Sequence, residues 1–210
     1  LGHLLGVPGS GPLVDHGLAA LHGLLRDPVD GGWYAAVSAD GVPDPAKDAY
    51  QHAFVVLGAA SATAAGRPGA SDLLAEALAA YERFWDEDAG LFVESYDRTW
   101  QTCEPYRGAN SNMHGVEACL AAGDVTRDPR WHERALRIAS LLVDDVARTH
   151  GWRLVEHFDP EWRPILAYHH DDPAHPFRPY GTTVGHWLEW SRLLLQLEAS
   201  LPAPPSWPLE

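Results

Sequence analysis

YRGANSNMHGVEACLAA (residues 106–122) and FRPYGTTVGHWLEWSRLLLQL (residues 177–197) set the helical plan of this chain, because each carries a His-x-x-Glu pair where a helix is predicted to begin. The pairs are His114 with Glu117 and His186 with Glu189. Residues three apart on a helix share one face, so each Glu can hydrogen-bond its own imidazole or bind the same ligand. An unperturbed His titrates at about 6.5. Two such pairs therefore predict one pocket for acid–base chemistry near neutral pH.

A loose repeat with a period near 60 residues runs outward from these motifs. Gly32, Gly90 and Gly151 lie 58 and 61 residues apart, and each precedes a bulky residue. Such a Gly fits a left-handed helix end, and the short apolar run after it fits a brief extended segment. Helical spacing of apolar residues predicts helices over residues 13–25, 47–65, 72–85, 112–122, 129–147 and 183–200. The predicted fold class is all-α, with helical hairpins that stack to bury their apolar faces.

Composition fits a single globular domain over residues 1–210. Hydrophobic residues make up 46% of the chain, which has nine Trp and seven Tyr for a core. The net charge of −14 argues against partners such as nucleic acid or an anionic membrane surface. No apolar run approaches the roughly 20 residues of a membrane span. The two cysteines and the absence of a charged signal-peptide region at the first residues favour a cytoplasmic location.

Two long connections, residues 99–112 and 158–182, concentrate aromatic, Arg and His side chains. Long loops in compact domains are often functional. Aromatic rings stack on the C–H faces of a sugar, while polar side chains pair with its hydroxyls. These connections therefore predict a pocket for a small sugar.

Five segments resemble the N-acylglucosamine 2-epimerase superfamily, and within it the mannose isomerase and sulfoquinovose isomerase branch. They are residues 31–34, 47–60, 106–122, 152–159 and 177–197, in the family's order. The patterns RGxNxNMHxxEA and PxGxTxGHxxEW are the specific part of the match. The resemblance implies an (α/α)6 toroid around a sugar cleft. It also implies aldose–ketose isomerisation of a monosaccharide, of the D-mannose to D-fructose type, through a cis-enediol and without a cofactor or metal.

The resemblance also implies the site residues. The catalytic positions fall on His186, His114 and Glu189, and the substrate-binding positions on Asn110, Arg178, Tyr50 and Glu117. In the expected mechanism His186 is the general acid/base at the reacting carbons, and Glu189 orients its ring and raises its pKa. His114, with Asn110, assists ring opening. Glu117 is either a substrate contact or only the hydrogen-bond partner of His114. Val184 stands where many relatives have Pro.

Length predicts an incomplete toroid. Six hairpins with a period near 60 need roughly 360 residues, and this chain supplies about three and a half. It begins at Leu1 without an initiator Met, and the Pro-rich residues 201–210 are expected to be a linker toward a further part. We therefore expect unpartnered apolar helix faces, a tendency to form homo-oligomers, and little turnover by these 210 residues alone.

Other functions stay open on the sequence. One alternative is a sugar 2-epimerase of the same family, of the N-acylglucosamine or cellobiose type. Another is a non-catalytic or truncated sugar-binding module. Two His/Glu pairs on facing helices also resemble metal sites of helical bundles, although those usually read Glu-x-x-His. A glycosidase needs two carboxyl groups across the scissile bond, and the repeated His favours proton transfer instead.

Overall fold

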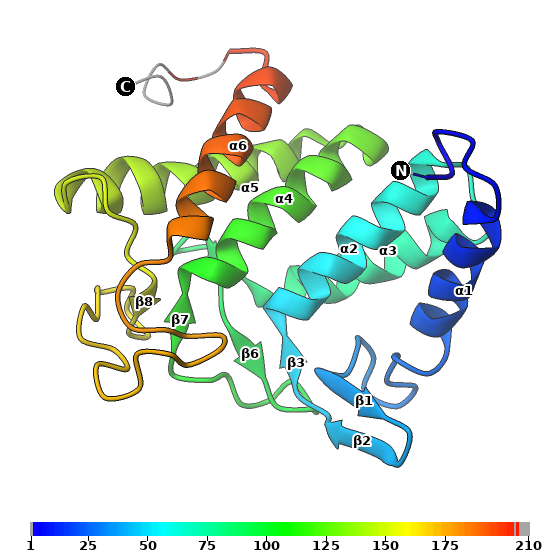
Figure 1. The fold of residues 1–210 in the computed structure, drawn as a ribbon, viewed down its shortest axis with the longest axis horizontal. Coiled ribbons are helices and arrows are strands. Elements are labelled where there is room, and N and C mark those ends of the chain that lie inside the picture. The colour runs from blue at the N-terminus through cyan, green and yellow to red at the C-terminus, as the bar shows by residue number, and fades with distance from the viewer. Residues whose placement is uncertain (1, 204, 206–210) are drawn as a thin grey trace.

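The computed structural model describes residues 2–203 and 205, and in that part of the chain six α-helices dominate (Figure 1). The helices are α1 (Ser10–His22), α2 (Ala49–Ala64), α3 (Ala70–Tyr81), α4 (Ala109–Thr126), α5 (Pro129–Ala139) and α6 (Val184–Ser200). A 3-10 turn, η1 (Glu82–Phe84), ends α3, and a π-helix, η2 (Ser140–Ala147), continues α5. The predicted all-α class is confirmed, and every predicted helix is present within a few residues of its expected bounds.

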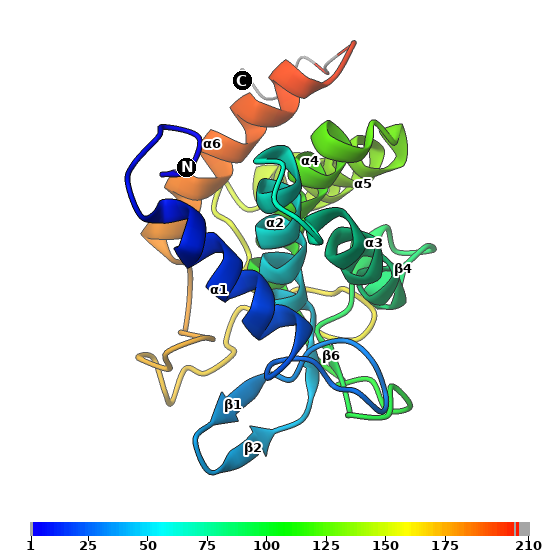
Figure 2. The same cartoon turned by 90° about the vertical axis from the view of Figure 1, so that its right-hand side faces the viewer.

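Three inner helices form one layer, because α2 packs on α4 and α4 packs on α6. All three begin on the side where the strands and long connections gather (Figure 1). Helix α3 packs against α2, and α5 packs against α4, so these two belong to the outer layer, with α1 beside α2 (Figure 2). The described residues therefore contain two packed hairpins, α2–α3 and α4–α5, and α6 as a third inner helix.

Four two-stranded antiparallel sheets, found among the described residues, are additions that the sequence did not predict in detail. The pairs are β1 (Ala36–Ser38) with β2 (Gly41–Asp44), β3 (Lys47–Asp48) with β6 (Ser95–Tyr96), β4 (Trp85–Asp86) with β5 (Leu91–Phe92), and β7 (Arg107–Gly108) with β8 (His157–Phe158). Asp48 and Gly108 are extended and lead directly into α2 and α4. The sheets β3–β6 and β7–β8 therefore fix where two inner helices begin.

The repeat glycines have the left-handed backbone that the sequence predicts, with φ of 68° at Gly32, 73° at Gly90 and 68° at Gly151. At Gly32 a Cβ would lie 2.7 Å from the Trp100 ring and 2.8 Å from Nε2 of His52, so a side chain has no room there. Glycine is needed at this position for both conformation and space.

The core lies between the layers, and small residues let the helices approach closely. Gly115 of α4 faces Phe92 and Tyr81, whose fully buried rings stack with centroids 4.2 Å apart. In α6, the face with Trp190 is buried, whereas Leu188 and Leu195 are 71% and 59% exposed. This exposed apolar face of α6 is of the kind the sequence predicts for an incomplete toroid.

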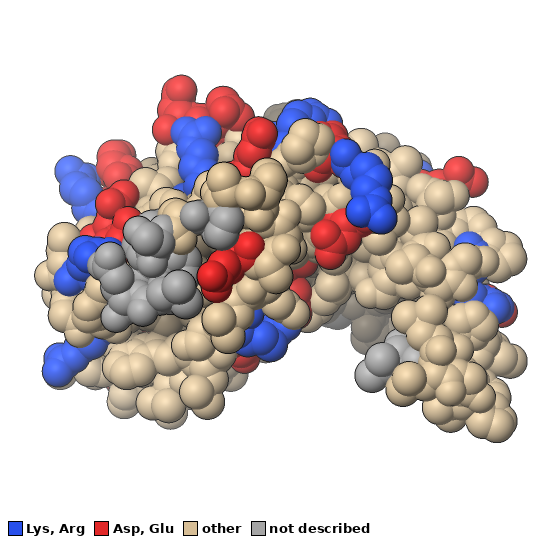
Figure 3. Space-filling view, turned by 90° about the horizontal axis from the view of Figure 1, so that it is seen from above, with Lys and Arg blue, Asp and Glu red and all other residues tan. Residues whose placement is uncertain are grey.

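Seen from above, Lys and Arg are interspersed with Asp and Glu, and broad areas carry neither (Figure 3). Within the described residues no helix has the length and apolar character needed to cross a membrane. Of the predicted linker, residues 201–203 and 205 are non-helical, and residues 204 and 206–210 lie outside the described residues.

Candidate functional site

A cavity of about 530 Å³ lies where α2 and α4 begin. Its lining includes three of the residues predicted to contact substrate, which are Tyr50, Asn110 and Arg178. Aromatic side chains from the connection before α6, Tyr168 and Phe177, line it as well. The structure therefore brings the connection before α6 and the starts of α2 and α4 to one cavity.

Two buried amide oxygens of this cavity wall lack a hydrogen-bond partner within the described part of the chain. They are Oε1 of Gln51 and Oδ1 of Asn110. The carboxyl groups of Asp48 and Glu94 also face the cavity. A buried acceptor without a partner is costly, so these oxygens favour a ligand rich in hydroxyl donors.

Asp48 and Glu94 were not predicted as site residues, and the pKa of each is raised. Burial raises the pKa of Glu94 to about 7, although the Ser111 hydroxyl, which donates to its Oε2 at 2.6 Å, opposes that shift. Burial also raises the pKa of Asp48 to about 6, and repulsion from Asp44 adds to it. Carboxyl groups that titrate near neutrality in a cavity are typical of functional sites.

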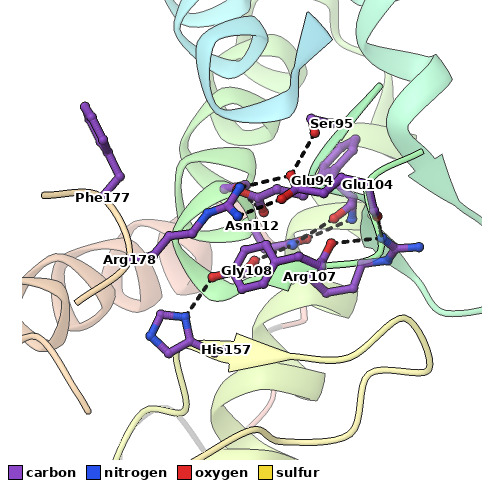
Figure 4. A network of polar contacts seen from close by, with 12 residues as sticks. Glu94, Ser95, Glu104, Arg107, Gly108, Asn112, His157, Phe177 and Arg178 are labelled. Carbon is purple, nitrogen blue, oxygen red and sulfur yellow. Dashed lines mark hydrogen bonds and ion pairs between the residues drawn. The ribbon is translucent and has the colours of Figure 1, made fainter. Parts of the chain in front are cut away.

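Arg178 lies on the ring of Tyr106, with its guanidinium carbon 4.0 Å from the ring centroid. Its Nη1 and Nη2 donate to the two carboxylate oxygens of Glu104 at 2.7 and 3.0 Å. Oε1 of Glu94 is 3.8 Å from Nη2. Figure 4 shows the guanidinium pointing toward both carboxylates, while the ring of Phe177 points away from them.

Histidines hold the segment that carries Arg178. Nδ1 of His169 donates to the Arg178 carbonyl at 2.7 Å, and Nδ1 of His175 accepts from the Arg178 N–H at 3.0 Å. Nε2 of His157 donates to the Pro179 carbonyl at 2.8 Å. These bonds fix the backbone on both sides of the guanidinium, so Arg178 is a positioned group of the cavity wall.

His186 is held by Glu156, which corrects the expectation that Glu189 orients the ring. Nδ1 of His186 lies 3.0 Å from both carboxylate oxygens of Glu156, which is almost fully buried. The hydrogen bond to Glu156 raises the pKa of His186, burial lowers it, and the charge of Glu189 adds a smaller upward effect. Glu189 therefore acts on His186 through charge, because the buried Glu156 already occupies Nδ1.

His114 follows the predicted pairing, since its Nδ1 lies 3.3 Å from Oε2 of Glu117. Tyr50 stands edge-on to the His114 ring, with centroids 5.1 Å apart. Oε1 of Glu117 accepts from Arg192 of α6 at 2.9 Å. Glu117 thus ties α4 to α6 and supports His114.

Glu156 joins the starts of two inner helices. Its backbone carbonyl accepts from the N–H of Ala109, the first residue of α4, at 2.9 Å. Its carboxylate accepts from the N–H of Thr183, the N-cap of α6, at 3.2 Å. Burial and then the charge of Glu189 raise the pKa of Tyr50. Ring and ion-pair contacts thus connect Tyr50 of α2 with His114 of α4, and Glu117 of α4 with Arg192 of α6. Four predicted site residues are not among the described residues that line the cavity, namely His114, Glu117, His186 and Glu189.

Sequence comparison identifies relatives over the whole chain. The model of the family described as N-acylglucosamine 2-epimerase matches residues 1–207. A D-mannose isomerase of Thermobifida fusca is 60% identical over 209 residues, which are 99% of this chain and 51% of that protein. A D-mannose isomerase of Pseudomonas cannabina pv. alisalensis is 47% identical over 202 residues, which are 95% of this chain and 48% of the relative.

The fold comparison agrees with the sequence. A crystal structure of a D-mannose isomerase superposes with a TM-score of 0.88 at 30% identity, and the match covers 95% of this chain and 51% of that one. The chain spans about half the length of the curated relatives that it matches.

Proposed function

Because the chain belongs to the N-acylglucosamine 2-epimerase family, we propose that its site works in an aldose–ketose isomerase that converts D-mannose to D-fructose. The 60% identity to a D-mannose isomerase supports D-mannose as the sugar. A cytoplasmic location and self-association belong to the same proposal. The observation that carries it is the pair of carboxylate-held imidazoles, His114 and His186, of which His114 stands against Tyr50 of the cavity wall.

Ligand chemistry supports a sugar. The unpartnered oxygens of Gln51 and Asn110, together with the carboxyl groups of Asp48 and Glu94, can all accept from hydroxyl groups. Tyr168 and Phe177 offer apolar ring surface on the same wall. A polyol satisfies both kinds of surface, and D-mannose fits this description.

Proton transfer is assigned to His186. Glu156 accepts hydrogen bonds, so Nδ1 of His186 carries the proton and Nε2 keeps a free lone pair when the ring is neutral. In the proposed step Nε2 takes the proton from C2 of the open-chain aldose. The C2–H electrons form the C1=C2 bond of the cis-enediol, and O1 is protonated. The enediol then loses its O2 proton as C1 receives one, which gives the ketose.

His114 is assigned to proton exchange with the oxygen atoms of the sugar. Glu117 holds its Nδ1 in the same way, which leaves Nε2 available to exchange a proton with a sugar oxygen during ring opening. Asn110 lies one turn earlier on α4 and offers its unpartnered oxygen to a hydroxyl. Glu189 contributes negative charge near His186 and Tyr50.

The test uses a chimera in which these 210 residues replace the matching half of the Thermobifida fusca D-mannose isomerase. In deuterium oxide we expect D-mannose to become D-fructose with deuterium at C1, followed by NMR. His186→Asn should lower kcat by about 10² to 10⁴, the effect of losing a positioned acid/base. His16→Asn, which alters an exposed imidazole of α1, is the matched control and should change little.

Alternative outcomes point to other functions. Deuterium at C2 with D-glucose as product would assign a 2-epimerase. Sugar binding without turnover would assign a binding module, and turnover that EDTA abolishes would assign a metal site. An active chimera in which His186→Asn retains full activity would contradict the role of His186.

A further inference from the structure

Arg178 is the only Lys or Arg among the described residues that line the cavity. A free guanidinium in a sugar site is a receptor for phosphate or sulfonate, because its N–H groups match two anionic oxygens at once. Whether this cavity accepts a charged sugar therefore depends on what the Arg178 fork already binds.

Glu104 occupies that fork. Both of its carboxylate oxygens accept from Arg178, at 2.7 and 3.0 Å, while the Ser95 hydroxyl donates to Oε2 at 2.9 Å. Burial opposes ionisation of Glu104, but the Arg178 guanidinium holds the pKa of this carboxyl below its usual value. The pair is thus ionised on both sides, and Glu104 takes one N–H of Nη1 and one of Nη2, the two donors that would otherwise bind the oxygens of an anion side by side.

The rest of the cavity wall adds repulsion. Asp44, Asp48 and Glu94 all line the hollow, so its carboxyl groups outnumber its one guanidinium. The imidazole of His175 accepts two backbone N–H bonds, from Phe177 and Arg178, and the accepting Nδ1 therefore carries no proton. An incoming phosphate would meet carboxyl groups and a guanidinium that is already neutralised.

We propose that Glu104 determines the specificity of this site. Because its carboxylate pairs with the guanidinium of Arg178, the cavity accepts uncharged sugars and excludes phosphorylated or sulfonated ones. Glu104 acts through Arg178, so it is a positioning residue and does not take part in proton transfer. The assignment rests on the proposed sugar site and adds the charge class of its ligand.

The test is an NMR titration of the 210-residue chain with D-mannose and with D-mannose 6-phosphate, at pH 7.5 and low salt. The wild-type chain binds D-mannose and binds the phosphate ester at least about tenfold more weakly. Glu104→Gln should strengthen binding of the ester about 10- to 100-fold, the range of a regained charged hydrogen bond, while binding of D-mannose changes less than about threefold. Glu161→Gln is the matched loss of one carboxylate, at a residue that pairs with Arg163 instead, and should leave both affinities unchanged.

Two further measurements separate specificity from folding. The double variant Glu104→Gln/Arg178→Gln should lose the gained affinity for the ester, because the receptor is gone. In the wild-type chain, the preference for D-mannose should shrink as salt rises, because screening weakens the repulsion. This second measurement does not depend on any variant being folded.

Three results would overturn the proposed role of Glu104. The proposal is overturned if Glu104→Gln weakens both ligands equally, which is the behaviour of a purely structural residue. It is also overturned if the wild-type chain binds the ester as tightly as D-mannose, or if the gain persists without Arg178. If the Glu104→Gln chain gains affinity for D-mannose 6-phosphate but neither chain binds D-mannose, the proposed isomerase is refuted, while the role of Glu104 in excluding anions stands.

Discussion

Replacing Gly115 by Ala tests how tightly the helix that carries His114 is held. Gly115 lies one residue after His114 on α4. A Cβ there would lie 2.9 Å from Cδ2 of Phe92 and 3.0 Å from the Tyr81 hydroxyl oxygen, both closer than normal contact. Both rings are fully buried and stacked on each other, so neither can move aside without opening the core.

Two effects of opposite sign determine how much Gly115→Ala changes the free energy of unfolding. Ala is favoured over Gly inside a helix by about 1 kcal/mol. One extra methyl group in a full core costs about 1–3 kcal/mol. Gly58, in the middle of α2, is exposed and has nothing within 4 Å of its Cβ position, so Gly58→Ala has the first effect without the second. The difference between the two variants is therefore the packing term alone, about 1–3 kcal/mol in the free energy of unfolding.

The assay is urea unfolding of the wild-type chain and both variants, with Tm as a second readout. Gly58→Ala should be as stable as wild type or more so, and Gly115→Ala should lie below Gly58→Ala by about 2–4 °C in Tm per kcal/mol of packing cost. Tyr81→Phe removes an oxygen that has no partner in the described chain, so adding it to Gly115→Ala should recover part of the loss. Equal stabilisation by both alanines would refute the close approach of α4 to Phe92 and Tyr81.

Three further predictions follow from charge and exposure. Glu156 raises the pKa of His186, so the stability that Glu156→Gln removes should be largest below pH 6.5 and should vanish as pH rises through the raised pKa, as pH-dependent unfolding would report. Glu94 has its pKa raised to about 7, so its folded form prefers the proton: stability should fall as pH rises from about 4.5 to 7, and Glu94→Gln should reduce that fall, leaving the part that the raised pKa of Asp48 contributes. Leu188→Glu/Leu195→Glu should reduce self-association in light scattering, because it charges the exposed face of α6; unchanged association would place the contact elsewhere.

Local spacing predicted the helices and one of the two His partners. His114 and Glu117 share a face of α4, and the pairing three residues apart is present. The same rule fails at His186, because Glu156 lies 30 residues earlier and reaches the start of α6 through the β7–β8 pairing. A contact made across a two-residue strand leaves no periodic signal in sequence. Glu156 lies in a segment that matches the family, but spacing alone gave it no role.

The cavity carboxyls were missed for a related reason. Asp48 ends β3 and Glu94 immediately precedes β6, and the β3–β6 pairing brings them to one wall. Their acidity depends on burial, which a sequence does not record residue by residue. Asn110, Tyr50 and Arg178 were predicted as substrate contacts because they lie in motifs of the family, and all three line the cavity.

The central claim is that the starts of α2, α4 and α6 form one sugar site with His114 and His186 in it. Imidazole NMR of the chain, titrated with D-mannose, tests it most directly. We expect the ring signals of both histidines and the side-chain amide of Asn110 to shift along one binding curve with one Kd, while the exposed His16 stays unchanged. Signals that do not move, or two histidines that follow different curves, would contradict a single site.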